Sequence, residues 1–237
     1  MSPNALNEGI NKSFTEQVGA GRGDSMTAGS STFIIRRDPF RAIRRGRQLF
    51  QRKFGMAQGL GPRHRDGMGD MNVELALGAG LGDSCASCHG RPRGSAGFGG
   101  DVVTRPDSRD APHLFGLGLK EMLADEITAD LRAIRDAATK QARTTGGSVT
   151  RALTSKGISF GSITVDDDGT VDTTAVEGID ADLRVRPFFS HGGTISIREF
   201  VVGALNNEMG MQAYDPELRA AGAGGMVTTA GGMVLDG

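Results

Sequence analysis

Cys85-Ala86-Ser87-Cys88-His89 contains both cysteines of the 237-residue chain and one of its four histidines. This C-x-x-C-H spacing is typical of the site at which a c-type haem is attached. Two thiols three positions apart can each form a thioether with one vinyl group of the porphyrin, and the histidine that follows then lies under the iron. The sequence therefore predicts one covalently bound haem c, with Cys85 and Cys88 as anchors and His89 as the proximal iron ligand.

Three other roles for the two cysteines stay open. A closed structural zinc site usually needs four Cys or His ligands at short spacings, but His64, His113 and His191 stand far apart in the chain. A thioredoxin-like redox pair would need a βαβ context, which the sequence around this motif does not show. A disulfide across a two-residue gap would leave His89 without a role. We therefore favour the haem.

The composition is short of bulky apolar groups. Apolar residues make up 38% of the chain and aromatic residues 5%, there is no Trp, and 37 residues are glycine. Such a chain has difficulty filling a core from its own side chains, and a buried porphyrin would supply apolar surface. The 27 basic and 28 acidic residues give a formal net charge of −1, which gives no indication of nucleic-acid binding or of a polybasic membrane contact.

Neither a membrane span nor a secretion signal is visible in the sequence. No apolar run approaches the ~20 residues of a transmembrane helix, and residues 1–20 lack the apolar centre of a signal peptide. Because c-type haem is normally attached outside the cytoplasm, we expect a periplasmic or extracytoplasmic location and interpret the chain as a mature or trimmed form.

The chain order predicts a mainly α, cytochrome c-like haem domain with long loops. Residues 1–37 are polar and Gly/Ser-rich and predict a flexible N-terminal arm. The haem domain is expected over 38–217, with a small β-hairpin insertion at about 156–186. Residues 218–237 form a Gly/Met-rich tail, which we interpret as cut before a second haem domain.

Asp38 and Pro39 predict the start of a basic helix, with the aspartate as cap and the proline at the first position. Ile43, Phe50 and Phe54 then recur near helical spacing. Basic residues occupy the other positions: Arg41, Arg44, Arg45, Arg47, Arg52 and Lys53. We expect most of them to form a solvated face. The alternatives are that one or two pair with haem propionates, or that this face docks an acidic redox partner.

The longest predicted helix and a β-hairpin follow the haem motif. The helix has one apolar stripe and ends before Gly146-Gly147. The members of the stripe are Leu123, Ile127, Leu131, Ile134 and Ala138. Phe160, Ile163 and Val165 precede Asp166-Asp167-Asp168-Gly169, and Val171 follows, which predicts a hairpin with an Asp-Gly turn. Calcium at the three aspartates is a weaker alternative, since the ligand spacing and distal Glu of an EF-hand loop are lacking.

A last helix is predicted from a capping box, in which Ser196 caps the helix and Glu199 lies three residues later. This helix should run to about Met209 and stop at Gly210. Its inward stripe contains Ile197, Phe200, Val201, Ala204 and Glu208. Glu208 is the exception on that stripe, because a carboxylate on an apolar face is costly unless it is paired, protonated or functional.

Four stretches together resemble a known family. They are Gly46-Arg47-Gln48-Leu49-Phe50 with Gly59-Leu60-Gly61-Pro62; Ser84 to His89; Arg109-Asp110-Ala111-Pro112 with Gly116-Leu117-Gly118-Leu119; and Phe188-Phe189-Ser190-His191-Gly192-Gly193 through Ile197-Arg198-Glu199-Phe200 to Glu208-Met209-Gly210. In this order they resemble the di-haem c-type oxidoreductases related to bacterial cytochrome c peroxidases and MauG, and in particular the branch of di-haem, or thiol, oxidoreductases.

The resemblance implies roles for several residues. Glu208 would be the distal acid/base that moves protons during peroxide cleavage, and Arg109, Pro112 and Phe200 would contact the cofactor. Residues 90–108 contain no histidine where relatives with a bis-histidine haem place a ligand, so an open or water-bound sixth position is expected. The substitute sixth ligands are His113, His191 and Met209.

Two departures from the family pattern limit what the resemblance implies. Phe200 stands where the family has glutamine, and the spacing to Glu208 is two residues short. The chain has one C-x-x-C-H, whereas the family carries a second haem, so the partner expected is a redox protein or a second haem-bearing domain or subunit. We expect a redox enzyme acting on peroxide or a similar small oxidant. The alternatives are an electron-transfer cytochrome subunit with a six-coordinate haem and a structural subunit whose haem supports assembly.

Overall fold

The computed structural model divides the chain into two compact units. One unit, the sheet unit, spans Gly116–Phe200, and the other, the motif unit, combines Met1–Phe115 with Val201–Gly237. The residues that the structure describes are 34–35, 37–55, 82–89, 111–189, 192–211, 213, 215–223, 226–228 and 234–235. The predicted N-terminal arm therefore lies almost wholly outside the described residues.

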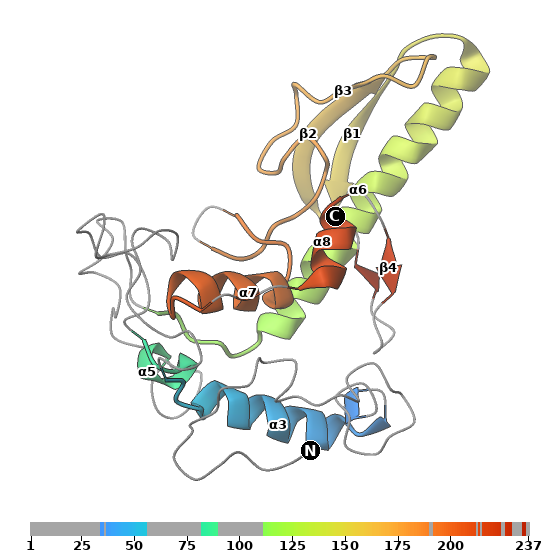
Figure 1. Cartoon of the computed structure of the whole chain (residues 1–237). Helices are drawn as coiled ribbons and strands as arrows, with labels where there is room; N and C mark the ends of the chain where they lie inside the picture. Colours follow the sequence, from blue (N-terminus) through green and yellow to red (C-terminus); the bar gives the residue numbers. More distant parts are fainter. Residues whose placement is uncertain are drawn as a thin grey trace, which may run out of the picture. The chain divides into compact units, whose positions relative to one another are not determined.

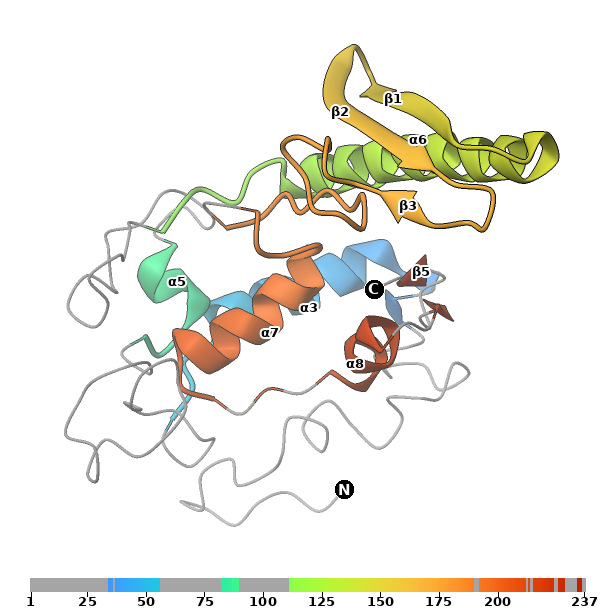
Figure 2. The ribbon, with the colours of Figure 1, turned by 90° about the horizontal axis from the view of Figure 1, so that it is seen from above.

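The sheet unit consists of one long helix on a small antiparallel sheet. Helix α6 (Leu117–Thr145) is followed by β1 (Val149–Ser155), β2 (Ile158–Val165) and β3 (Val171–Asp172), which pair in the order β1-β2-β3. The helix lies along one face of the sheet (Figures 1 and 2). Gly146, in the left-handed conformation with φ 67°, ends α6 and lets the chain turn into β1.

The apolar core of the sheet unit lies between α6 and the strands. Leu131 of α6, Leu153 of β1 and Val165 of β2 are fully buried. The complete cluster is Ile127, Leu131, Ala138, Ala142, Val149, Leu153, Phe160, Ile163, Val165 and Leu183. The helical members recur at spacings of four and seven positions, as residues on one helix face do. The expected stripe of α6 is thus confirmed for Ile127, Leu131 and Ala138, whereas Leu123 is 47% exposed.

Two turns set the register of the sheet. Lys156 and Gly157 join β1 to β2 with φ angles of 50° and 78°, as the two-residue turns that suit the twist of a hairpin require. The Asp-Gly turn between β2 and β3 is confirmed, because Gly169 has φ 93° and the Asp166 N–H donates to the Thr170 carbonyl at 2.9 Å.

The motif unit contains short elements. Its helices are α3 (Pro39–Gln51), α5 (Cys85–Cys88) and α8 (Pro216–Gly222), and its strands β4 (Val227–Thr228) and β5 (Val234–Leu235) form a second sheet. Helix α7 (Ile197–Asn207) begins in the sheet unit and ends in the motif unit. The predicted cap of α3 is confirmed, since the Asp38 carboxylate accepts from the Arg41 N–H at 3.0 Å.

The capping box of α7 is confirmed in part. The Glu199 N–H donates to the Ser196 hydroxyl oxygen at 3.1 Å, as expected. The Glu199 carboxylate instead accepts from the N–H of Ile195, at 2.8 Å. At the other end, Gly210 adopts φ 64° and the chain leaves the helix, as predicted.

The predicted mainly α, cytochrome c-like fold is wrong. The largest described core lies between one helix and a three-stranded sheet, and the sheet begins at Val149 rather than near residue 156. The sequence of β1 did not indicate a strand, because an irregularity between Ala152 and Thr154 breaks the alternation of apolar and polar residues. The division into arm, haem domain and tail stays a prediction. Among the described helices, none has the length and apolar character needed to cross a bilayer.

Candidate functional site

Helix α5 is a single turn that presents both cysteines. Ser84 is extended, with φ −160° and ψ 157°, and the chain then closes one turn in which the His89 N–H donates to the Cys85 carbonyl at 3.0 Å. Residues three and four apart lie on the same side of such a turn, so Cys85, Cys88 and His89 share a face. Both thiols are free, and no disulfide joins them.

The C-terminal end of α3 is tied to the residue just before this turn. The Phe54 N–H donates to the Asp83 carbonyl at 2.8 Å, and the Lys53 ammonium lies 3.0 Å from the Asp83 carboxylate. The hydrogen bond from Lys53 lowers the pKa of Asp83, with burial opposing it. Helix α3 also packs against α5 (Figure 1). The motif is therefore held by backbone and ionic contacts on its N-terminal side.

His89 is oriented by a backbone carbonyl. Its Nδ1 lies 2.9 Å from the carbonyl oxygen of Pro112, 23 positions along the chain. A carbonyl can only accept, so Nδ1 carries the hydrogen and Nε2 keeps its lone pair. Histidines that bind metals usually have the other ring nitrogen bonded in this way. The ring of Phe50 packs near the imidazole, with centroids 6.2 Å apart.

The two thiols differ in their surroundings. Burial raises the pKa of the Cys85 thiol, with a smaller contribution from Cys88 in the same direction. The thiol of Cys85 is therefore held in its protonated form more firmly than a solvated cysteine. Ser87 donates to the Ser84 carbonyl at 2.6 Å, and its oxygen lies 3.8 Å from the Cys88 sulfur.

Gly82 brings the end of α7 to the motif. A Cβ at this position would lie 3.6 Å from the Cys88 sulfur and 3.9 Å from the Glu208 carbonyl oxygen. It would also lie 3.3 Å from the Ser87 hydroxyl, so the absence of a side chain allows this close approach. Glu208 itself is half-buried, and the next residue, Met209, is 4% exposed. The predicted distal segment and the predicted anchor therefore meet at Gly82.

Two of the remaining predicted residues are described and make aromatic contacts with neighbours of their own. Phe200 belongs to the sheet unit, where its ring lies 4.8 Å from that of Phe189 and 6.5 Å from that of Phe188. His113 is exposed and stacks on Phe115 at 6.1 Å. The residues that lie outside the described part of the chain are His64, Arg109 and His191.

Two of the three aspartates of the β2–β3 turn accept hydrogen bonds from nearby residues. The Asp168 carboxylate accepts from the Thr170 N–H at 2.8 Å, and this bond lowers the pKa of Asp168. Asp166 accepts from the Ser148 hydroxyl. Within the described ranges, no three His, Cys, Asp or Glu side chains gather as a metal ion would require. Calcium at this turn stays an untested prediction.

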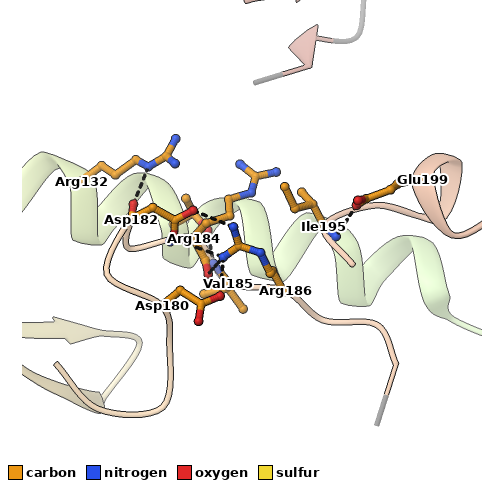
Figure 3. Close-up of polar contacts among 9 residues, drawn as sticks. Arg132, Asp180, Asp182, Arg184, Val185, Arg186, Ile195 and Glu199 are labelled. Carbon is orange, nitrogen blue, oxygen red and sulfur yellow. Dashed lines mark hydrogen bonds and ion pairs between the residues drawn. The ribbon is translucent and has the colours of Figure 1, made fainter. Parts of the chain in front are cut away.

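Sequence reasoning missed an arginine–aspartate cluster in the sheet unit (Figure 3). Arg186 pairs with Asp180 and Asp182, each at 2.7 Å, and Arg184 pairs with Asp125 of α6 at 3.0 Å. The hydrogen bond from Arg186 lowers the pKa of Asp182. The signal was the D-x-D-x-R-x-R alternation over 180–186. The cluster ties the segment after the sheet to α6 and takes no part in the motif.

Comparisons with known proteins give this chain no relative. No model of a protein family matches the sequence, and neither the curated proteins nor the solved structures contain a match. The functional argument therefore depends on the geometry around Cys85–His89.

Proposed function

We propose that this chain is a redox protein that carries one covalent haem c on Cys85 and Cys88, with His89 as the axial ligand. The observation that carries the proposal is the hydrogen bond from His89 Nδ1 to the Pro112 carbonyl at 2.9 Å, next to two free thiols on one helical turn. This local arrangement does not depend on a cytochrome fold, since sites of one chemistry occur on different folds.

The residues present fit the group. Each thiol can add across one vinyl C=C bond, which forms one C–S bond and places the thiol hydrogen on the neighbouring carbon, so attachment needs no net oxidant or reductant. His89 offers Nε2 to the metal, and the Pro112 carbonyl fixes the orientation of the ring by accepting from Nδ1. Phe50 covers part of the imidazole. When bound, the haem supplies one-electron chemistry at its iron.

The partner we propose is a redox protein or a second haem-bearing domain or subunit. A chain with one haem exchanges electrons singly, so it needs a donor and an acceptor that do the same. A haem c on this chain also implies a periplasmic or extracytoplasmic location.

A second candidate function is peroxide reduction, with Glu208 as the distal acid/base. The observation that favours it is that the backbone of Glu208 reaches the motif, since a Cβ at Gly82 would lie 3.9 Å from the Glu208 main-chain oxygen and 3.6 Å from the Cys88 sulfur. A carboxylate placed near the reacting oxygen atoms could take a proton from one and deliver it to the other. Alternatively, Met209 in the same segment could be the sixth ligand of the iron. The protein would then be an electron carrier without catalysis of its own.

The first experiment tests attachment. The chain, produced together with a c-type haem maturation system, should hold haem through extraction with acidified organic solvent and show the reduced spectrum of a thioether-linked haem. Cys85→Ser with Cys88→Ser should lose this haem, whereas Ser87→Ala should keep it. Haem that is fully extracted from the wild-type chain, or zinc found in its place, would contradict the proposal.

The second experiment separates the two functions. Readily bound carbon monoxide and a high-spin ferric spectrum indicate an open iron, and Glu208→Gln should then slow peroxide reaction at least ~100-fold. A low-spin spectrum that carbon monoxide leaves unchanged indicates two protein ligands, and Met209→Leu should then convert the protein to the high-spin form. Glu217→Gln, on α8 in the same unit, is the control for loss of one carboxylate.

A further inference from the structure

Arg52 has a buried nitrogen without an acceptor. Its Nη2 is shielded from solvent, and none of the described residues accepts a hydrogen bond from it. A buried polar group costs free energy when its hydrogen bond is missing, and the cost is larger for a charged group. Buried donors in folded proteins are nearly always paired, so this atom requires an acceptor that the described residues do not supply.

The position of Arg52 places that acceptor next to the haem motif. Arg52 follows α3, and its guanidinium lies over the ring of Phe54, 5.4 Å from the centroid. Phe54 in turn is bonded through its N–H to Asp83, two residues before Cys85. The carboxylate of Asp83 is already engaged by Lys53 at 3.0 Å and by the Ser84 hydroxyl at 3.2 Å.

We propose that Arg52 binds a propionate carboxylate of the haem. The inference rests on the proposed covalent haem, which brings two carboxylates to this part of the chain. A guanidinium suits the role, because its planar array of N–H groups can bond both oxygens of one carboxylate. The guanidinium carbon lies 5.4 Å from the centre of the Phe54 ring, which keeps the group beside the motif. The acceptor that Nη2 lacks is thus supplied by the cofactor.

The other arginines of α3 offer matched controls. Arg44 and Arg47 lie on the exposed side of the helix, whereas Arg52 is half-buried. Replacing Arg47 removes the same charge from the same segment, but solvent and salt screen an exposed charge. A difference between the two variants therefore reports a specific contact rather than the loss of net charge.

The test is the midpoint potential of the loaded haem in Arg52→Gln and in Arg47→Gln. Removing a paired positive charge leaves the propionate unneutralised and favours the ferric form. We expect the ferric-to-ferrous equilibrium to shift at least tenfold in Arg52→Gln, which is ~59 mV downward for one electron. Arg47→Gln should shift it less than ~twofold. Arg52→Lys keeps the charge and should recover at least half of the shift.

The outcomes separate this inference from the proposed function. Equal shifts in Arg52→Gln and Arg47→Gln, with haem covalently attached, overturn the role of Arg52 alone. A wild-type chain that attaches no haem overturns both. If Arg52→Gln fails to load, Arg52→Lys is compared with Arg47→Lys, and a lower potential in the former alone supports the contact because an ammonium cannot make the two-point bond. Equal potentials in those two variants overturn it.

Discussion

The two units differ in how they obtain an apolar interior. In the sheet unit, a 29-residue helix and three strands bury a continuous set of aliphatic and aromatic side chains. In the described part of the motif unit, α3 buries no residue, and the buried apolar residues are scattered along the chain: Ile34, Phe54, Met209, Ala221 and Leu235. The sheet unit makes a core from its own side chains, whereas the described residues of the motif unit show only scattered buried apolar side chains.

This contrast refines the argument from composition. The low content of bulky apolar residues is a property of the whole sequence, yet the sheet unit buries a continuous core. The described part of the motif unit shows no such cluster, and a porphyrin would contribute apolar surface there. We therefore expect the motif unit to depend on the cofactor and the sheet unit to be stable without it.

The largest expected effect is on the rate of amide hydrogen exchange. It is measured on the full-length Cys85→Ser/Cys88→Ser variant, which should carry no haem. Amides of β1 and β2 should exchange at least ~1,000-fold more slowly than those of α3, after correction for intrinsic rates, because they open only with the sheet unit. In the loaded wild-type chain the difference should shrink. Equal protection of α3 with and without haem would contradict the dependence on the cofactor.

The next largest effect is in the core of the sheet unit. Leu131→Ala should lower the free energy of unfolding by about 2–5 kcal/mol, since Leu131 is fully buried and its loss leaves a cavity. Leu119→Ala on the same helix is the control, because Leu119 is 73% exposed and its replacement should cost less than about 0.5 kcal/mol. Denaturant unfolding followed by circular dichroism measures both. The haem spectrum should stay unchanged in each variant.

A smaller effect is expected from the bulged strand β2. Gly161 has φ 76°, and a Cβ there would lie 2.0 Å from the Ala175 carbonyl oxygen. Gly161→Ala should therefore cost about 2 kcal/mol or more in free energy of unfolding, because the backbone must move. Gly178→Ala has a similar φ of 73° but open space around it, and should cost about 1 kcal/mol. Equal losses in denaturant unfolding would show that the Ala175 contact is unimportant.

The smallest effect concerns Asp182, whose pKa is lowered from 3.8 chiefly by the hydrogen bond from Arg186. A carboxyl with a lowered folded pKa stabilises the fold above its unfolded pKa and loses that contribution as the pH falls through its folded pKa. Because its side chain is 41% exposed, the contribution should be below about 1 kcal/mol. Asp182→Asn should be destabilised at neutral pH, and the difference from wild type should vanish in acid below the folded pKa.

Urea unfolding at neutral pH and at strongly acidic pH checks this pH dependence. Asp136→Asn is the control for loss of one surface carboxylate, since Asp136 pairs with its neighbour Arg135. A difference between wild type and Asp182→Asn that persists in acid would mean that the aspartate acts through packing rather than charge.

Local signals in the sequence predicted several elements correctly. The cap at Asp38, the apolar stripe of α6 from Ile127 onward and the Asp-Gly turn each depend on residues close together in the chain. The stripe failed at Leu123 because Ala124 and Thr128 take the buried positions, and the Thr128 hydroxyl accepts from the Val185 N–H at 3.0 Å. Which small residues are buried under a crossing segment depends on where that segment runs. The helical periodicity of the sequence does not show this path.

The site was predictable in part for a similar reason. The motif itself specifies Cys85, Cys88 and His89, and one helical turn presents them together. Gly82 and Phe50 were not predicted as part of the site, because their contacts arise from folding of distant segments onto the motif. Phe200 was predicted from a resemblance of sequence order, and the structure places it in an aromatic cluster of the sheet unit.

The acceptor for His89 Nδ1 is a main-chain oxygen, and this has a consequence for mutagenesis and for sequence comparison. No side-chain replacement at position 112 can delete it, and Pro112→Ala should leave the imidazole in the same orientation if the backbone keeps its path. The orientation of the histidine is thus determined by the path of the chain, and the residue type at position 112 does not reveal it. A change in the route of the chain through 111–115, such as an inserted residue, would turn the ring.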